Sequence, residues 1–421
     1  MPDRTVAPPF SQIEKFSIKE PARYDLGNGL LLFTIQAGTQ PVVKLELIFH
    51  AGKWTEQIHG AAFFTGQMLR EGAGTYNSFD LSSLFESVGA HLEISPGLDY
   101  IVITLHTIEK HLPKLLPVLK LLILKPGFPE EEFKTLKNLQ IQKLRINNEK
   151  NSYLASKKLR ESLFGNTHPY GHILEEAQIN DLDRNELIRH FQKNIYKKPF
   201  TIISSGLFSE ASINSIIDTF SDIQSNSQIA VADKPQEYSH SDVAIDKSES
   251  SQSSIRIGCI SIPMDHPDYP GLLFVNEILG GFFGSRLMKN IREEKGLTYG
   301  IYSSISTLKN ASFFFISADV KKDFRTEVFD EIKLELSRLS SEKASGEEIE
   351  TVRNYMLGQL QASINTPFAL ASKFKSIYFS GLSYDYYRNL VQAIKTINTD
   401  RILELSSKYL SYESMVKVYV G

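Results

Sequence analysis

Arg292 and Tyr299 stand on either side of the segment EEKGLT, and both side chains are hydrogen-bond donors. A guanidinium and a phenol can polarise a peptide carbonyl and stabilise the negative charge that develops on its oxygen during hydrolysis, with each donor contributing about 10²–10³ in rate. Two donors of these types could therefore bind a substrate carbonyl and its oxyanion, but the R-x6-Y spacing occurs often by chance and does not assign this role by itself. The alternative is that Arg292 lies in a charged surface segment and that Tyr299 packs at a strand edge.

Other residues that commonly carry chemistry are sparse. The closest histidine pair, His168 and His172, brackets a proline and a glycine, so we expect a structural turn there. The single cysteine, Cys259, lies in the strand-like run IRIGCISI, which favours a buried thiol over a nucleophile and excludes a multi-thiolate zinc site. No G-x-S-x-G elbow, P-loop or dinucleotide fingerprint occurs. We expect this chain to bind no metal ion and no cofactor of its own.

Composition narrows the class of protein. A chain of 421 residues is longer than one hydrophobic core usually serves, so two or more domains are expected. The 46 basic and 49 acidic side chains leave a formal net charge of -3, which offers no basic surface for nucleic acid and no cationic face for a membrane. The opening residues MPDRTVAPPF lack the positively charged start and apolar core of a signal peptide, so we expect a cytoplasmic protein.

The elements that would position Arg292 and Tyr299 follow one plan used twice. The segment from Glu131 to the LASK of residues 154–157 recurs at the same spacing from Glu347 to the LASK of residues 370–373. Each half begins with strand-like apolar runs, KLELIFHAG in the first and SIRIGCISIP in the second, and continues with long amphipathic helices.

This repeat predicts an α+β fold of two similar α/β-sandwich lobes, each a mixed sheet with helices. Residues 225–254 are rich in serine and acidic residues, a composition typical of a linker. We therefore expect an N-terminal lobe at residues 1–224 and a C-terminal lobe, which carries the arginine–tyrosine pair, at residues 255–421.

The segment RLMKNIREEKGLTYGIYS resembles the arginine–tyrosine motif of the insulinase, pitrilysin and mitochondrial-processing-peptidase family (M16) of zinc metallopeptidases. The resemblance covers about residues 22 to 421 and includes GNGL at 27–30, HAGKWTEQIHGAA and FGNTHPYG. It implies that Arg292 and Tyr299 reach across a cavity between two lobes and hold the substrate over a zinc ion bound by the other lobe.

The zinc-binding half of that family's site is missing. The family motif H-x-x-E-H supplies two zinc ligands and a glutamate that activates water. The matching helix reads GAAFFTGQML, so Phe63, Gly66 and Gln67 stand at these positions. The resemblance also implies a third ligand, a glutamate further along the chain, but residues 134–148 contain no acidic residue. Phenylalanine and glycine offer neither a ligand nor a base, which predicts a degenerate zinc site.

A further substitution concerns the substrate. The family's edge-strand asparagine, which holds the substrate backbone, corresponds to Glu93 in GAHLEIS. With the arginine–tyrosine half present and the zinc half absent, we predict a noncatalytic subunit that binds peptide and pairs with a zinc-bearing homologue containing H-x-x-E-H. Zinc is then expected only in the partner, with Arg292 and Tyr299 completing its site. The alternative is a structural or peptide-binding homologue with no catalytic role, as the resemblance to core subunits of respiratory complexes allows.

Overall fold

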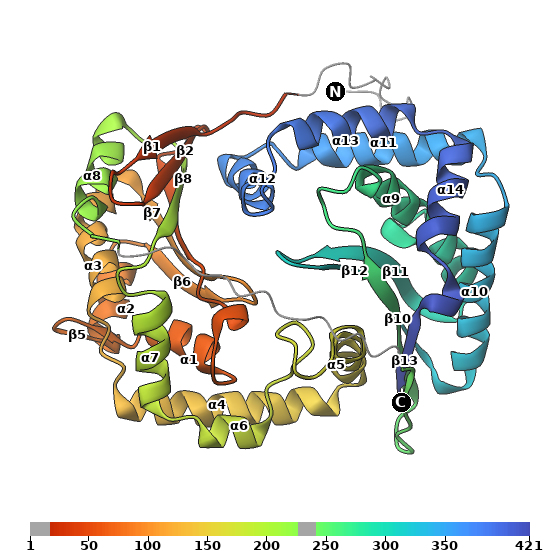
Figure 1. The fold of residues 1–421 in the computed structure, drawn as a ribbon, viewed down its shortest axis with the longest axis horizontal. Coiled ribbons are helices and arrows are strands. Elements are labelled where there is room, and N and C mark those ends of the chain that lie inside the picture. The colour runs from red at the N-terminus through yellow and green to blue at the C-terminus, as the bar shows by residue number, and fades with distance from the viewer. Residues whose placement is uncertain (1–16, 226–240) are drawn as a thin grey trace, which may run out of the picture.

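The described part of the chain, residues 17–225 and 241–421 of a computed structural model, forms two α+β lobes (Figure 1). Each lobe has one mixed β-sheet with helices packed on it, which confirms the expected fold class. Of the predicted linker, residues 226–240 lie outside the described residues. The remainder contributes β9 (Val243–Ile245) and the first residues of β10 (Gln252–Ser261) to the second sheet.

The N-terminal lobe contains a six-stranded sheet in the order β1-β2-β8-β3-β7-β6, in which β2 and β8 run parallel and the other pairs antiparallel. Its strands are β1 (Ala22–Asp25), β2 (Leu31–Gln36), β3 (Val42–Phe49), β6 (His91–Pro96), β7 (Ile101–Ile108) and β8 (Phe200–Gly206), and a separate short hairpin joins β4 (Gly72–Ala73) to β5 (Tyr76–Asn77). The central strand β3, VVKLELIF, is almost continuously buried because both of its faces are covered.

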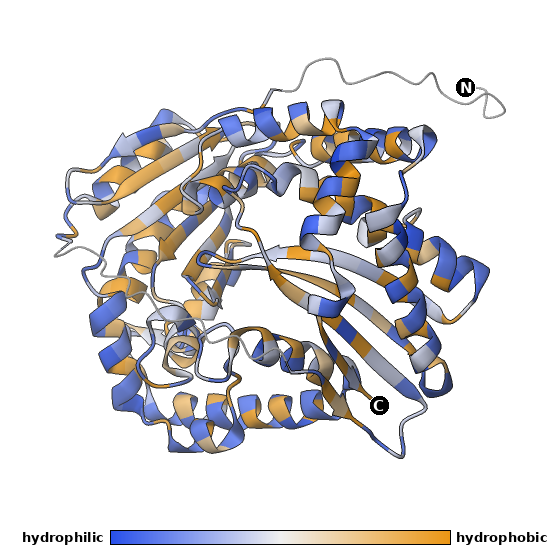
Figure 2. Ribbon diagram, turned by 45° about the vertical axis from the view of Figure 1, so that its right-hand side comes forward, coloured by the Kyte–Doolittle hydropathy of each residue, from blue (hydrophilic) through white to orange (hydrophobic). Residues whose placement is uncertain are grey.

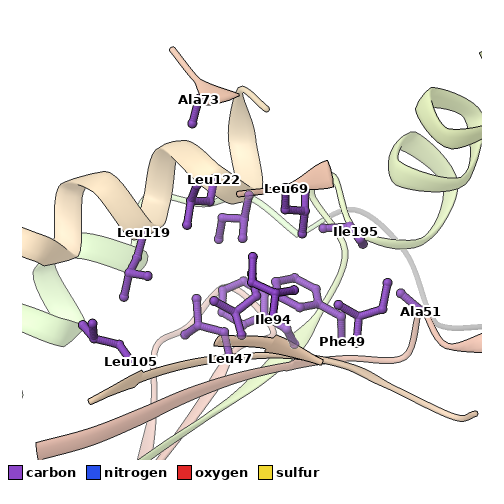
Figure 3. Close-up of a cluster of buried hydrophobic side chains, with 14 of the residues drawn as sticks. Leu47, Phe49, Ala51, Leu69, Ala73, Ile94, Leu105, Leu119, Leu122 and Ile195 are labelled. Carbon is purple, nitrogen blue, oxygen red and sulfur yellow. The ribbon is translucent and has the colours of Figure 1, made fainter. Parts of the chain in front are cut away.

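Helices cover one face of this sheet. They are α1 (Ala61–Met68), α2 (Ser78–Glu86), α3 (Leu112–Leu124), α4 (Glu130–Glu149), α6 (Glu176–Asp181), α7 (Arg184–Asn194) and α8 (Glu210–Phe220). Helix α5 (Asn151–Phe164) follows α4 in the chain but packs on the sheet of the other lobe. Figure 3 shows the core, in which Leu119 and Leu122 of α3 lie above Leu47 and Leu105 of the sheet. This apolar layer fixes α1, the helix of the degenerate motif, against the sheet.

The C-terminal lobe repeats this plan with a five-stranded sheet in the order β11-β12-β10-β13-β9. The remaining strands are β11 (Thr298–Thr307), β12 (Ser312–Lys321) and β13 (Val416–Val420), and the helices are α9 (Tyr269–Asn276), α10 (Arg325–Ser341), α11 (Gly346–Ala362), α12 (Pro367–Phe379), α13 (Asp385–Thr396) and α14 (Thr399–Tyr409). Two π-helical segments, η3 (Glu277–Gly281) and η4 (Met288–Glu294), lie between α9 and β11. Cys259 of β10 is buried as expected, and burial raises the pKa of its thiol to about 12.

The two lobes exchange helices. Helix α5 packs on β10 and β13 of the C-terminal sheet, where Leu159 and Leu163 contact a cluster that includes Val418. Helix α12 packs on β2 and β8 of the N-terminal sheet, where Phe374 lies 4.7 Å from Phe33, measured between ring centroids. These are the two helices that carry the repeated LASK sequence. Each lobe therefore completes the core of the other.

Polar contacts add to this interlocking. Glu46 of β3 is buried and forms ion pairs with Lys375 of α12 at 2.6 Å and with Lys44 at 3.1 Å. Burying a carboxylate without a partner is costly, so the cation from the other lobe offsets the burial of Glu46. Figure 2 shows hydrophobic residues along the strands of both sheets and alternating with hydrophilic ones along the helices. No helix within residues 17–225 and 241–421 is long and apolar enough to cross a membrane.

Candidate functional site

The N-terminal half of the expected site lies on α1, directly beside strand β6. Gly66 is buried, and a Cβ atom added there would lie 2.9 Å from Cβ of Pro96. Gln67 turns its amide toward the edge strand, with Nε2 3.4 Å from the carbonyl oxygen of Ile94. The helix therefore approaches the strand so closely that a glutamate at position 66 has no room for its side chain.

Phe63 occupies the first ligand position and belongs to the apolar core. It is half-buried, and its ring centroid lies 5.2 Å from that of Phe64. Phe64 in turn contacts Phe133 of α4, at 5.9 Å between centroids. Zinc in proteins needs nitrogen, sulfur or carboxylate ligands, so the side chains at the three motif positions do not fit this ion. Across the described residues, no three His, Cys, Asp or Glu side chains are arranged to hold a metal.

A carboxylate that the sequence analysis did not single out fixes the start of α1. Oε2 of Glu56 accepts hydrogen bonds from the backbone N–H groups of Gly60 and Ala62, at 3.1 and 3.2 Å. A carboxylate at a helix N-terminus is favourable because it satisfies unpaired donors and opposes the helix dipole. Nearby, the rings of His59 and His172 stack at 3.6 Å, and the predicted turn at His168 is confirmed by its carbonyl, which accepts from the N–H of His172 at 2.7 Å.

We predict that restoring the motif residues does not restore a zinc site. In the variant Phe63→His/Gly66→Glu/Gln67→His, the new glutamate would collide with Pro96, and residues 134–148 of α4, where the third ligand is expected, contain no acidic residue. Overpacking of this kind costs about 1–3 kcal/mol of stability. Elemental analysis after gel filtration should find no stoichiometric zinc, and urea unfolding should show the loss of stability.

The matched control is the double variant Phe63→His/Gln67→His, which keeps Gly66 and should lose less stability than the triple variant. One tightly bound zinc per chain in the triple variant, with chelator-sensitive peptide cleavage, would contradict the account of a closed site.

Glu93 lies on β6, the edge strand of the N-terminal sheet. Its side chain is exposed, and it accepts a hydrogen bond from Oγ of Ser95 at 2.6 Å. Within the described chain β6 pairs with β7 alone, which leaves one side of its backbone without a neighbouring strand. An edge of this kind can accept an extended peptide as an additional strand.

The other half of the expected site lies on η4 and β11, which pack against each other. Arg292 is half-buried in η4, and its guanidinium carbon lies 4.6 Å from the ring centroid of Phe283. Tyr299 is 93% exposed at the start of β11, where the pairing register shifts between Thr298 and Ile301. Throughout the described residues, neither Arg292 nor Tyr299 has a hydrogen-bond or ion-pair partner. Tyr299 therefore does not pack at the strand edge.

A polar contact between the lobes, which the sequence analysis did not anticipate, lies at the tip of the β11–β12 hairpin. The backbone N–H of Lys309 donates to Asp99 at 3.3 Å, and Nζ of Lys309 lies 3.2 Å from Nδ1 of His50. The hydroxyl of Tyr170 donates to Asp99 at 2.5 Å and accepts from the backbone N–H of Asn310 at 3.3 Å. Lys309 is 210 and 259 residues away from Asp99 and His50 in the sequence, so local sequence patterns do not predict these contacts.

Burial, and then the charge of Lys309, lower the pKa of His50 to about 4, so the imidazole is neutral in the folded protein at neutral pH. In the unfolded chain a histidine titrates near 6.5. As pH falls from about 6.5 to 4, the unfolded state binds the proton more readily, and His50 therefore lowers stability progressively over this window.

We predict that His50→Gln weakens the decline of thermal stability between pH 6.5 and pH 4, measured by unfolding at a series of pH values. Glutamine keeps a polar side chain that does not titrate. The control is His91→Gln on β6, because His91 is exposed and lies away from Lys309. Equal pH dependence in the wild type and in His50→Gln would contradict this assignment.

Two models of one protein family match the two halves of this chain in order. The family model described as "Insulinase (Peptidase family M16)" matches residues 32–177, and the model described as "Peptidase M16 inactive domain" matches residues 181–356. The chain is 22% identical over 348 residues to "Uncharacterized zinc protease YmxG" of Bacillus subtilis (strain 168), covering 82% of this chain and 84% of that protein. It is 21% identical over 354 residues to "Non-peptidase homolog YmxG" of Helicobacter pylori (strain ATCC 700392 / 26695), covering 82% of this chain and 80% of that protein.

Solved structures share the fold. The peptidase M16 inactive domain from Pseudomonas fluorescens superposes with a TM-score of 0.86 at 23% identity, covering 95% of this chain and 98% of that one. A chain of complex III2 from Candida albicans superposes with a TM-score of 0.76 at 15% identity, covering 95% of each. With both family models matched in order and the helix of the zinc motif carrying Phe63, Gly66 and Gln67, this chain belongs to the M16 family of insulinase-like peptidases as a member without the H-x-x-E-H motif.

Proposed function

We propose that this chain is the noncatalytic subunit of a heterodimeric M16 zinc metallopeptidase. It binds peptide and supplies Arg292 and Tyr299 to an active site whose zinc is held by a homologue containing H-x-x-E-H. The observation that carries this proposal is the state of Tyr299, which is 93% exposed and has no hydrogen-bond partner in the described part of the chain. A phenol in this state is free to donate to a group outside its own chain.

The two halves of the site support the same division of labour. In the partner, zinc would polarise the substrate and lower the pKa of bound water. From this chain, the hydroxyl of Tyr299 and the guanidinium of Arg292 would donate to the peptide carbonyl as negative charge develops on its oxygen. Such donors act most strongly where water is excluded, which requires that the two chains close around the peptide.

Peptide binding by this chain has independent support in strand β6. Its free edge offers backbone donors and acceptors to an extended peptide, and Glu93 stands on it with an exposed carboxylate. A carboxylate accepts hydrogen bonds but cannot donate them at neutral pH, unlike an asparagine amide. We expect Glu93 to favour peptides with a basic residue or an available N–H at this position.

The test is co-purification. The full chain, tagged and expressed in its own organism at native level, should retain a homologue with H-x-x-E-H in stoichiometric amount, and the complex should contain one zinc per pair. A neighbouring gene that encodes such a homologue would identify the first partner to try. Purification of the chain without any zinc-bearing homologue, at concentrations where heterodimers persist, would contradict the proposal.

A second function is a structural or peptide-binding role without catalysis. The observation that favours it is the interlocked pair of lobes, in which α5 packs on the C-terminal sheet and α12 packs on the N-terminal sheet. The fold similarity to a chain of complex III2 is compatible with such a role. This reading predicts stable assembly with a partner in which Tyr299→Phe changes no enzymatic rate.

A further inference from the structure

The loop that joins the two π-helical segments, residues 282–287, follows two glycines that end η3 and contains a third. A Cβ atom added to Gly280, the penultimate residue of η3, would lie 2.6 Å from the backbone nitrogen of Ser303 on β11, and one added to Gly281 would lie 2.5 Å from the carboxyl carbon of Glu277. A Cβ atom added to Gly284 would lie 2.8 Å from the ring of Phe282. The approach at Gly280 is to backbone, so position 280 requires glycine. A side chain at position 281 or 284 would displace the carboxyl group of Glu277 or the ring of Phe282.

The two phenylalanines between these glycines have opposite environments. Phe282 is half-buried, contacts the C-terminal core and stacks on Tyr355 of α11, with 4.8 Å between centroids and 29° between the ring planes. Phe283 is 63% exposed, and its ring centroid lies 4.6 Å from the guanidinium carbon of Arg292. The inward ring therefore anchors the loop, and the anchored loop fixes the outward ring against Arg292.

The ring of Phe283 is the feature of the structure that restrains the side chain of Arg292. Among the described residues its side chain has no ion pair and no hydrogen bond, and its guanidinium lies against the ring of Phe283. An arginine without restraint samples many rotamers, whereas a planar guanidinium stacked on an aromatic face is pre-organised. Donors that are already in place when charge develops contribute most to catalysis.

We propose that Phe283 is the positioning residue for Arg292, holding the guanidinium over its ring face in the orientation that the substrate carbonyl requires. This inference rests on the proposed function and extends it to a residue outside the arginine–tyrosine pair. It requires an aromatic face at position 283, whereas a role in packing alone requires only an apolar side chain.

The experiment uses the full chain mixed with the zinc-bearing homologue from the same genome and a quenched fluorogenic peptide library as substrate. Phe283→Leu keeps an apolar side chain but removes the ring, and we expect kcat/KM to fall about two- to fivefold, as for loss of an exposed cation–π contact. Phe283→Trp keeps an aromatic face and should restore the rate to within twofold of the wild type. In an Arg292→Ala background, Phe283→Leu should cause no further loss.

The outcomes separate this inference from the function on which it rests. If Arg292→Ala lowers the rate while Phe283→Leu does not, the positioning role is wrong and the proposed function stands. If Phe283→Leu lowers the rate equally in the presence and absence of Arg292, Phe283 acts on its own and the positioning role is again wrong. If Arg292→Ala has no effect, or the mixture cleaves no peptide, the proposed function fails and this inference fails with it.

Discussion

Tyr299→Phe should lower peptide turnover by the reconstituted complex by about 10²–10³, the usual effect of removing one oxyanion donor. The substitution deletes one hydroxyl from a side chain that is 93% exposed, so the fold and the thermal stability of the chain should be unchanged. The loss should fall mainly in kcat, because the contact strengthens as charge develops on the substrate oxygen. Arg292→Lys should also impair turnover, since an ammonium cannot reproduce the planar guanidinium.

The matched control is Tyr302→Phe. Tyr302 lies three residues further along β11 and is also exposed, at 52%, so its replacement removes a phenol from the same strand. Turnover with Tyr302→Phe should equal that of the wild type. Full activity in Tyr299→Phe would remove this residue from the site and favour the structural role.

Leu163→Ala should destabilise the whole chain by about 2–5 kcal/mol, the range for truncating a fully buried leucine. Leu163 belongs to α5 of the N-terminal lobe, is fully buried, and lies in the cluster formed with Val416 and Val418 of the C-terminal sheet. Because the cavity would open between the lobes, urea unfolding should shift for reporters placed in either lobe.

The control is Leu139→Ala on the neighbouring helix α4, where the side chain is 57% exposed. Surface substitutions of this kind usually change stability by about 0.5 kcal/mol or less. Two separate unfolding transitions, of which only one responds to Leu163→Ala, would show that the lobes do not depend on each other as described.

The repeated segments identified most of the architecture from the sequence. The recurrence of LASK marked two segments as equivalent, and these segments form α5 and α12. Gly165 and Gly381, which follow the two helices, both have positive φ, 83° and 72°. The sequence could not show that these helices are exchanged. An amphipathic helix specifies that one face is buried, but not which of two similar sheets it covers.

The degenerate zinc site was predictable only in part. The residue types at positions 63, 66 and 67 exclude a zinc site by chemistry alone. The closeness of Gly66 to Pro96 depends on how α1 packs on β6, and this contact between helix and strand is not visible in local patterns. The contact between Arg292 and Phe283 is likewise not visible in local sequence patterns. The two residues are nine positions apart, one in a loop and one in a π-helical segment, and no regular helix or strand periodicity brings them together.

The boundary between the lobes remains a proposal. The second family model begins at residue 181, whereas β8, at Phe200–Gly206, pairs with β2 and β3 in the N-terminal sheet. Strand pairing places the chain through Gly206 in the N-terminal sheet, and Phe220 and Ile223 pack in the N-terminal core, which supports the proposed N-terminal lobe of residues 1–224. Strand β10 supports a C-terminal lobe that includes residues 255–421, and β9 extends that lobe's sheet into the segment predicted as a linker.

The most direct test of the central claim is peptide cleavage by three samples: this chain alone, the zinc-bearing homologue alone, and an equimolar mixture, each with and without a chelator. The account predicts that this chain alone cleaves nothing, that the mixture cleaves at least about 10²-fold faster than the homologue alone, and that the chelator abolishes the activity. Chelator-sensitive cleavage by this chain alone, or equal rates for the homologue with and without it, would contradict the claim that this chain is a noncatalytic subunit completing a partner's active site.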